Sequence, residues 1–301
     1  MERRTYRRDS DVALLQAFNA AATAETGGCG FVHPGDIPHR LFNGNKLFDP
    51  AEVLTVWEAG DRIAAWVLVG PSHRGFDAQV RPDLHGTDLE RKVLVYAEHR
   101  TTELMRHHGI DGQRIETEAY RCDTTRTELL VELGWCLAPE PPWVVNRIRL
   151  DGLEEPDVPD GYTVRAARGV EEAAALAAVH AASFGSTWTP ETYRKVMQSP
   201  GYEREFVVEA ADGALAAFTV TWHDHVNRTG LFEPVGTHPE HRRRGLGKAM
   251  LLFGMREMRA SGMQHATVVN EGRNVASAAL YRSAGFAQWH LLDVYTKPLP
   301  R

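Results

Sequence analysis

The sequence predicts an α/β fold in which a mixed sheet with covering helices is built twice along the chain. Strand and helix patterns alternate in a fixed order through residues 162–296, and a weaker copy of this order precedes them. A chain of 301 residues also exceeds what one hydrophobic core usually supports. The polar, proline-bearing stretch Asp151–Gly161 has the composition of a linker. We therefore expect two domains, 1–152 and 153–301.

The C-terminal half predicts its elements in a clear order. Residues 162–166 form a strand pattern, 170–184 an amphipathic helix pattern, and Thr189–Pro190 an N-cap that opens a second helix. A hairpin around Asp212 and Gly213 and a further strand follow, and then a helix, a short strand, a helix and a closing strand. The ranges of these later elements are 206–209, 215–222, 230–236, 246–259, 265–269, 275–283 and 286–296.

The segment 235–248, "VGTHPEHRRRGLGK", has the features of a phosphate-binding loop. Unpaired amides and the dipole at a helix start attract anions, and Gly245 and Gly247 allow a close approach to the backbone. A P-loop is excluded because Arg242 and Ala249 occupy its first glycine and its Ser/Thr position. A dinucleotide fingerprint is excluded because Met250 occupies its third glycine position. The remaining pattern is RxxGxG at Arg242, Gly245 and Gly247.

A second segment, "NEGRNVASAALYRSAGF" at 270–286, indicates by resemblance that this loop belongs to an acyl-CoA enzyme. With RxxGxG, it resembles the NxxAxxxYxxxGF pattern of the GCN5-related N-acetyltransferase (GNAT) family at Asn274, Ser277, Tyr281 and Gly285–Phe286. Ala278 lies one place late for the alanine of that pattern. Asn274 also fits an N-cap, so the residues alone leave both roles open.

The resemblance implies that the C-terminal domain binds acetyl-CoA and transfers its acetyl group to an amine by direct attack. It implies that Tyr281 protonates the leaving thiolate and that backbone amides where the fourth strand splays stabilise the oxyanion. Pro234 independently predicts an interrupted strand at that point. The expected cofactor-binding residues are Val235, Gly236, Thr237, Arg242, Arg243, Arg244, Gly245, Leu246, Gly247, Lys248, Asn274, Ser277 and Tyr281.

The general base is expected on the strand before this break. Glu233 is the first candidate, although a strand carboxylate facing solvent fits the same pattern. The alternates are His223, Asp224, His225 and Glu271. The expected acceptor site comprises Trp188, Trp222, His223, His225 and Glu271, although a large aromatic residue also fits a core position.

The N-terminal half is interpreted as an eroded repeat of the same plan. Aligning Pro82 with Pro239 places Asp88 and Glu90 at the two loop glycines, and aligning Gly134 with Gly285 places Leu130 at the tyrosine. Carboxylates at those positions repel a pyrophosphate. We therefore expect a catalytically silent GNAT-like domain without a CoA loop.

Composition limits the other function classes. The formal net charge of −6 disfavours a general nucleic-acid surface, and no apolar run suggests a membrane span or signal peptide. Cys29, Cys122 and Cys136 form no CxxC pair, so we expect neither a disulfide framework nor a metal site. His107–His108 and His223–His225 are the close histidine pairs, without a further ligand at recognisable spacing. We expect a cytoplasmic monomer or homodimer.

Three functions remain open on these grounds. The first is an N-acetyltransferase acting on the amine of a small metabolite or antibiotic. The second is a non-catalytic CoA or acyl-CoA binding protein, and the third is a nucleic-acid or protein-binding module that uses the arginine triplet, which predicts strongly salt-dependent binding. The tandem arrangement is similar to that of mycothiol synthases, but no residue of this sequence selects their acceptor.

Overall fold

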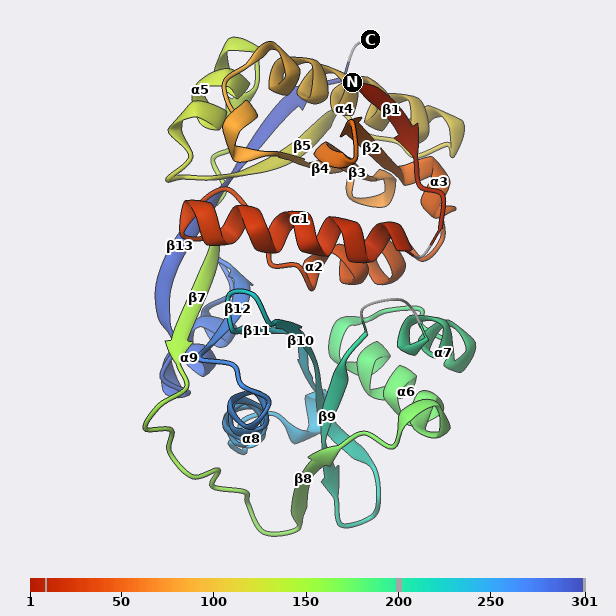
Figure 1. The fold of residues 1–301 in the computed structure, drawn as a ribbon. Helices are drawn as coiled ribbons and strands as arrows, with labels where there is room; N and C mark the ends of the chain where they lie inside the picture. Colours follow the sequence, from red (N-terminus) through yellow and green to blue (C-terminus); the bar gives the residue numbers. More distant parts are fainter. Residues whose placement is uncertain (9, 199–201, 300–301) are drawn as a thin grey trace. The chain divides into compact units, whose positions relative to one another are not determined.

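The computed structural model describes residues 1–8, 10–198 and 202–299 (Figure 1). The chain folds as two compact units, each made of more than one segment of the sequence. Unit 1 contains Met1–Val144, Glu271–Arg273 and the chain from His290 onward, and unit 2 contains Val145–Asn270 and Asn274–Trp289.

Unit 1 is built on a sheet with the strand order β1-β2-β3-β4-β5-β13, in which β6 also pairs with β13. Of the neighbouring strands from β1 to β5, β4 and β5 are parallel and the other pairs are antiparallel. The pairing of β4 with β5 is short: Gly75 lies opposite Glu116, and Phe76 lies opposite Thr117. The strands are β1 (Glu2–Thr5), β2 (Leu54–Ala59), β3 (Arg62–Gly70), β4 (Gly75–Val80), β5 (Arg114–Tyr120), β6 (Cys136–Leu137) and the last part of β13 (Ala287–Pro298). The helices are α1 (Ser10–Thr26), α2 (Asp36–Pro38), η1 (His39–Gly44), α3 (Pro50–Val53), η2 (Pro71–His73), η3 (Pro82–Leu84), α4 (Asp88–His107) and α5 (Thr124–Glu132).

Alternation along the strands of unit 1 gives each face of its sheet a helix to pack against. Trp66 points to one face, where its indole Nε1 donates to Asn19 Oδ1 of α1 at 3.0 Å. Thr55 points to the other face, where its hydroxyl is hydrogen-bonded to Tyr96 of α4 at 2.9 Å. The buried core of unit 1 includes apolar side chains on both faces.

A disulfide between Cys29 and Cys122 corrects the expectation that the cysteines are unpaired. Cys29 follows α1 and Cys122 follows β5, and their Cα atoms lie 6.1 Å apart although 93 positions separate them in sequence. Sequence spacing could not reveal this pair because the fold, not a local motif, brings the two loops together. Cys136 is a free, exposed thiol.

Unit 2 has the strand order β7-β12-β11-β10-β9-β8, and the start of β13 lies beside β7. Its strands are β7 (Trp143–Arg149), β8 (Tyr162–Ala166), β9 (Arg204–Ala210), β10 (Leu215–Asp224), β11 (Thr229–Thr237) and β12 (His265–Glu271). Its helices are η4 (Gly169–Glu172), α6 (Ala173–Phe184), α7 (Pro190–Met197), η5 (Pro239–His241), α8 (Leu246–Ala260) and α9 (Val275–Ser283). The order and type of the elements predicted for residues 162–296 are confirmed.

The helices of unit 2 lie on opposite faces of its sheet, with α6 and α7 on one side and α8 on the other (Figure 1). Val207 and Phe218 point to α6 and α7 and share a core with Leu176 and Tyr193. Phe206 and its neighbours on the opposite face pack against α8. The hydroxyl of Thr189 accepts from the backbone N–H of Thr192 at 3.1 Å, which confirms the predicted cap of α7.

The units are not the two contiguous halves 1–152 and 153–301. Strand β7, from the first half, continues into unit 2, and β13, from the second half, continues into unit 1. Each half therefore gives its last strand to the sheet of the other unit. The stretch 151–161, expected to be an interdomain linker, lies inside unit 2 and joins β7 to β8. Its Glu154 and Glu155 form ion pairs with Lys248 and Arg256 of α8 at 2.9 and 2.5 Å.

The two halves share local details of the predicted repeat. Pro82 and Pro239 each begin a short 3-10 turn before the long helices α4 and α8. Gly134 and Gly285 have φ angles of 84° and 94° after α5 and α9, a region that glycine adopts without steric cost.

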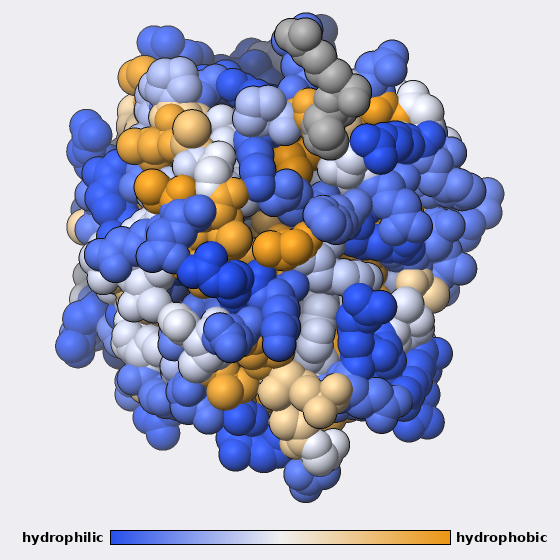
Figure 2. Space-filling model, turned by 90° about the horizontal axis from the view of Figure 1, so that it is seen from above, coloured by the Kyte–Doolittle hydropathy of each residue, from blue (hydrophilic) through white to orange (hydrophobic). Residues whose placement is uncertain are grey.

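The surface in Figure 2 is mainly hydrophilic, with apolar residues in small separate groups. Within the described residues, no helix is long and apolar enough to cross a bilayer.

Candidate active site

Strands β11 and β12 separate part way along their length, which opens the sheet of unit 2. Their parallel pairing begins where Thr229 lies opposite His265 and ends where Phe232 lies opposite Val268. Strand β11 then continues beside β10 as far as Thr237. The N–H of His238 donates to Ala216 O of β10 at 2.8 Å. Because strand amides alternate in direction, those of Val235 and Thr237 point away from β10, to the side that β12 has left. These two amides are available to an acyl carbonyl or an amide-bearing ligand chain.

Glu233 lies at a bulge in β11 just where this separation begins. Thr221 pairs with Phe232 and Thr219 pairs with Val235, so Val220 alone faces both Glu233 and Pro234. The interruption predicted at Pro234 is confirmed, and the Glu233–Pro234 peptide bond is cis. The indole Nε1 of Trp222 donates to the Glu233 carbonyl oxygen at 2.8 Å, which anchors the bulge from β10.

Tyr281 approaches the same place from α9. Its side chain is only 6% exposed. Burial, and then the negative charge of Glu233, raise the pKa of the Tyr281 hydroxyl above its usual value. The charge of Glu233, the first candidate base, therefore acts on the hydroxyl of the predicted acid, although the two residues lie 48 positions apart in sequence.

Asn274 caps the helix that carries Tyr281. Its Oδ1 accepts from the N–H of Ser277 at 3.1 Å, and the Ser277 hydroxyl donates to the Asn274 carbonyl at 3.0 Å. The structure therefore places Asn274 in the N-cap role that the sequence left open. The cap engages Oδ1 only, so the Nδ2 donors of this exposed amide are not used by it.

The arginine-rich loop ends at Gly245, the N-cap of α8, whose φ of 82° is left-handed and which has no side-chain cap. The first amides of α8 therefore keep no partner within the helix or from a cap. Arg242 donates from Nε to Thr237 O and from Nη2 to Ser183 O, both at 3.2 Å, and Arg244 donates to Glu240 O at 3.4 Å. These bonds hold the loop against the end of β11 and leave the exposed amides and cations as an anion-binding surface.

Several of the predicted loop residues also pack against neighbouring side chains. A Cβ on Gly247 would lie 3.1 Å from Leu280 Cδ2, so this glycine serves the packing of α8 on α9. A Cβ on Gly236 would lie 2.4 Å from the Phe218 ring, so this glycine serves the packing of β11. Leu246 is buried among core side chains. Gly245 differs from these residues, because the direction of its Cβ is open.

The predicted acceptor residues are scattered. Trp188 is buried between α6 and α7, where it stacks on His180 with ring centroids 4.3 Å apart. Trp222 is also buried, so neither indole forms an exposed cleft wall. His223 pairs with Gly230 three residues from Glu233, on the opposite face of the sheet from Trp222. His225 lies in the following turn.

The alternative candidates for the general base, Asp224 and Glu271, have partners away from Tyr281. Asp224 is buried and accepts from the amides of Val226 and Asn227 at 3.0 and 3.1 Å, so it shapes the turn after β10. Glu271 forms an ion pair with Arg273 at 2.6 Å and belongs to unit 1. Glu233 is thus the candidate carboxylate of unit 2 whose charge acts on the Tyr281 hydroxyl.

One buried carboxyl group near this site is not among the residues predicted from the sequence. Glu205 of β9 pairs with Val220, the residue opposite the Glu233 bulge, and therefore faces the same side of the sheet as Glu233. The hydroxyls of Tyr193 and Tyr202 both donate to its carboxyl oxygens. Burial raises the pKa of Glu205 to about 7. The available signal was an acid directly before the apolar run Phe206–Val208 in the strand "REFVVEA".

Unit 1 holds a carboxylate of its own where α4 begins. Glu90 is fully buried, and its Oε2 accepts from the N–H of Gly86 at 2.5 Å. Its Oε1 pairs with Arg126 Nε at 2.5 Å, and Arg126 Nη1 donates to Ala78 O, on β4 beyond its pairing with β5, at 2.9 Å. The Glu90–Arg126 pair thus occupies the Gly86 amide and the Ala78 carbonyl, near the positions that correspond to the loop and the opening in unit 2.

Comparisons with known proteins agree with this fold. The family model described as the acetyltransferase (GNAT) family matches residues 173–286. A mycothiol acetyltransferase of Nocardiopsis dassonvillei is 29% identical over 259 residues, which are 80% of this chain and 76% of that protein. One of Streptomyces avermitilis is 27% identical over 74% of this chain and 68% of that protein. One of Thermobispora bispora is 29% identical over 168 residues, and this match spans only 56% of that protein.

Two solved structures share the fold over the whole chain. A tandem GNAT protein from the clavulanic acid biosynthesis pathway has a TM-score of 0.69 and 18% identity, and the match covers 100% of this chain and 99% of that chain. A GCN5-related N-acetyltransferase from Sphaerobacter thermophilus has a TM-score of 0.65 and 20% identity over 99% of this chain and 95% of that chain. Residues 173–286 therefore form an acetyltransferase domain of the GNAT family, and the whole chain has the fold of tandem GNAT proteins.

Proposed function

We propose that this chain transfers the acetyl group of acetyl-CoA to the amine of a small-molecule acceptor, and that unit 2 carries the reaction. The observation that supports this proposal most strongly is the meeting of Glu233, Tyr281 and the outward amides of Val235 and Thr237 where β11 and β12 separate. GNAT proteins generally use acetyl-CoA, which supplies an acetyl group activated as a thioester.

The loop before α8 suits the pyrophosphate of that co-substrate. Gly245 needs its left-handed φ, and the α8 amides behind it lack a side-chain cap. Arg242, Arg243, Arg244 and Lys248 surround them with exposed positive charge. The Lys248–Glu154 ion pair is exposed and therefore weak, so an anion can displace it.

Each residue then has one task. The Glu233 carboxylate accepts the proton of the acceptor ammonium, directly or through water, so that the amine can attack. The amides of Val235 and Thr237 donate to the oxygen on which negative charge develops. The Tyr281 hydroxyl donates to the departing sulfur. Since its raised pKa exceeds the thiol value of about 8.5, hydrogen bonding to the sulfur precedes any complete proton transfer.

Unit 1 is proposed to be catalytically silent. A pyrophosphate at the start of α4 would have to displace the Glu90 carboxylate from the Gly86 amide and from Arg126. Separating a buried ion pair leaves an uncompensated charge and costs about 3–5 kcal/mol. Unit 1 is thus proposed to have lost pyrophosphate binding because Glu90 and Arg126 occupy the position, and not only because exposed carboxylates repel the anion.

Mycothiol acetyltransferase activity is the second candidate for the acceptor. It is supported by the three relatives of that name, two of which match over about three quarters of this chain. Because identity is below 30% in each of these, we propose the general amine acetyltransferase first.

The test is the rate of acetyl-CoA consumption with a panel of small amines, for the parent chain and for Glu233→Gln and Tyr281→Phe. We expect both variants to lower kcat by about 100-fold or more, as is usual for lost general acid–base groups. Glu257→Gln and Tyr96→Phe are matched controls. Glu257 lies on α8 and forms an exposed ion pair with Arg204 of β9, and Tyr96 lies in unit 1. Parent-like rates in both site variants would refute the roles, and tight CoA binding without turnover would favour a non-catalytic CoA-binding protein.

A further inference from the structure

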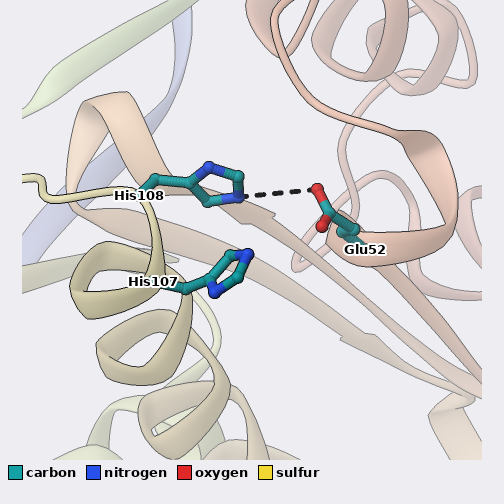
Figure 3. A group of neighbouring side chains, drawn as sticks. All are labelled: Glu52, His107 and His108. Atoms are coloured by element: carbon teal, nitrogen blue, oxygen red, sulfur yellow. Dashed lines mark ion pairs between the residues drawn. The ribbon is translucent and has the colours of Figure 1, made fainter.

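Three side chains with metal-ligating atoms meet at one edge of unit 1. Glu52 comes from α3, while His107 and His108 end α4 (Figure 3). One ligand atom from each residue lies within 4.8 Å of the other two, and His108 Nε2 is 3.5 Å from Glu52 Oε2. Both imidazoles extend from the end of α4 toward the Glu52 side chain (Figure 3).

Local structure holds two of these ligands in place. Asp49 caps the short helix α3 by accepting from the N–H of Ala51 at 2.8 Å. The carbonyl of Glu52 accepts from Arg100 Nη2 of α4 at 2.9 Å, which fixes α3 against α4. The ring of His108 packs edge-on against Phe48 with centroids 4.9 Å apart. Glu52 and His108 therefore need little reorganisation to bind a common ion.

The third ligand has the freedom to complete the group. His107 is exposed on the last turn of α4, so its ring can rotate toward the other two residues. Bonds of about 2.0–2.1 Å to a tetrahedral zinc ion place ligand atoms about 3.3 Å apart. The distance between His108 and Glu52 is already close to this value. Rotation of the His107 imidazole brings its ligand atom from within 4.8 Å of the other two ligand atoms to this spacing.

The charge at this position also favours a cation. Carbonyl groups at the C-terminal end of α4 carry the negative end of the helix dipole. Arg100 of α4, which contacts α3, is itself paired with Glu103 at 2.9 Å. One carboxylate and two neutral imidazoles form a ligand set that first-row divalent metals prefer, whereas Mg²⁺ and Ca²⁺ prefer oxygen ligands alone.

We propose that Glu52, His107 and His108 bind one first-row divalent metal ion, with Zn²⁺ as the probe. The ion joins α3 to the end of α4, and water completes its coordination. The site is independent of the proposed acetyl transfer, because all three ligands belong to unit 1 and the proposed catalytic residues belong to unit 2. It revises the expectation of no metal, since Glu52 is 55 positions before His107 and no spacing motif reveals it.

The test is isothermal titration of the metal-stripped full chain with ZnCl₂ near neutral pH, in a Cys136→Ser background that removes the exposed free thiol. We expect one ion per chain and a higher Tm of the unit 1 transition in its presence. His107→Gln, which alters an exposed side chain, and Glu52→Gln should each weaken binding more than about tenfold.

His99→Gln, on the same helix, and His223→Gln, in the other histidine pair, are the matched controls and should bind Zn²⁺ like the parent. Circular dichroism verifies that each variant is folded. The proposal is overturned if the parent binds no Zn²⁺ at a free concentration of about 100 μM. It is also overturned if binding survives in both His107→Gln and Glu52→Gln or disappears in His223→Gln.

Discussion

The indole Nε1 of Trp222 donates to the carbonyl oxygen of Glu233 at 2.8 Å, across the bulge at which β11 leaves β12. The side chain of Glu233 is the proposed base, and its backbone is thus fixed by a neighbour from β10. The sequence predicts Trp222 as a wall of the acceptor cleft. Its burial and this bond instead make it a positioning residue that acts through Glu233.

Trp222→Phe should therefore lower kcat by about 10- to 100-fold, because small displacements of a catalytic group are costly. The KM for acetyl-CoA should change little, since the loop before α8 is untouched. Trp66→Phe is the matched control, because the Trp66 indole is also buried and donates to Asn19 within unit 1 at 3.0 Å. A loss of stability in both variants with a loss of kcat only in Trp222→Phe supports the assignment. Equal kcat values in the two variants contradict it.

The two loop glycines should respond differently to alanine. Gly247→Ala forces a methyl group against Leu280, so it should destabilise unit 2 by about 1–3 kcal/mol through overpacking. Leu280→Ala in the same chain should recover part of that loss. Gly245→Ala meets no neighbouring atom but strains the left-handed φ, so it should raise the KM for acetyl-CoA without a Leu280-dependent effect. Thermal melts and steady-state kinetics measure both, and rescue of Gly245→Ala by Leu280→Ala would contradict this distinction.

Glu205 should make unit 2 less stable as pH rises. Its folded pKa is about 7 against an ordinary value of 4.5, so between these values the folded state keeps a proton that the unfolded state loses. Burial is the largest cause of this raised pKa, and the charge of Glu172 adds to it. The stabilising contribution is complete below about pH 4.5 and is lost as the pH rises through about 7.

Glu205→Gln removes this titration while keeping the shape of the side chain. The stability of the variant relative to the parent should increase from pH 5 to about pH 7 and then level off, as measured by urea denaturation of the full chain. Glu257→Gln, at an exposed carboxylate, should show no such trend. A constant difference between Glu205→Gln and the parent across that range would show that Glu205 is ionised in the folded protein.

Arg126→Met should destabilise unit 1 by about 3–5 kcal/mol, because it leaves the Glu90 carboxylate buried without its cation. Adding Glu90→Gln should restore much of the lost stability, since no charge then remains unpaired. Thermal unfolding of the single and double variants measures this coupling. Additive losses would mean that Glu90 and Arg126 do not act as a pair.

The sequence predicts those structural features that depend on neighbouring residues, and not those that depend on contacts between distant segments. The tyrosine helix is predicted at 275–283 and is found there, because its N-cap and apolar period are local. Strand β8 is likewise predicted with its observed bounds. The exchange of β7 and β13 between the units is not predicted, since pairing partners across the chain leave no local pattern.

The site shows the same division. The interruption at Pro234 follows from the chemistry of proline. Tyr281 follows from the family resemblance, and Glu233 from its place on the strand just before that interruption. Glu205, the Cys29–Cys122 disulfide and the contact of Glu52 with His108 depend on which residues the fold brings together. The packing of Gly247 against Leu280 is not predicted, because a glycine needed for helix packing has the same sequence signature as one that faces a ligand.

The central claim is that the chain contains two GNAT-like units and that only unit 2 binds acetyl-CoA. Isothermal titration of the full chain with acetyl-CoA tests it most directly, alongside the variant Arg242→Ala/Arg244→Ala in unit 2 and Arg91→Ala, at an exposed α4 arginine of unit 1. The account predicts one site per chain, weakened in the double variant and unchanged in Arg91→Ala. Two sites per chain, or a single site that survives in the double variant, would contradict it.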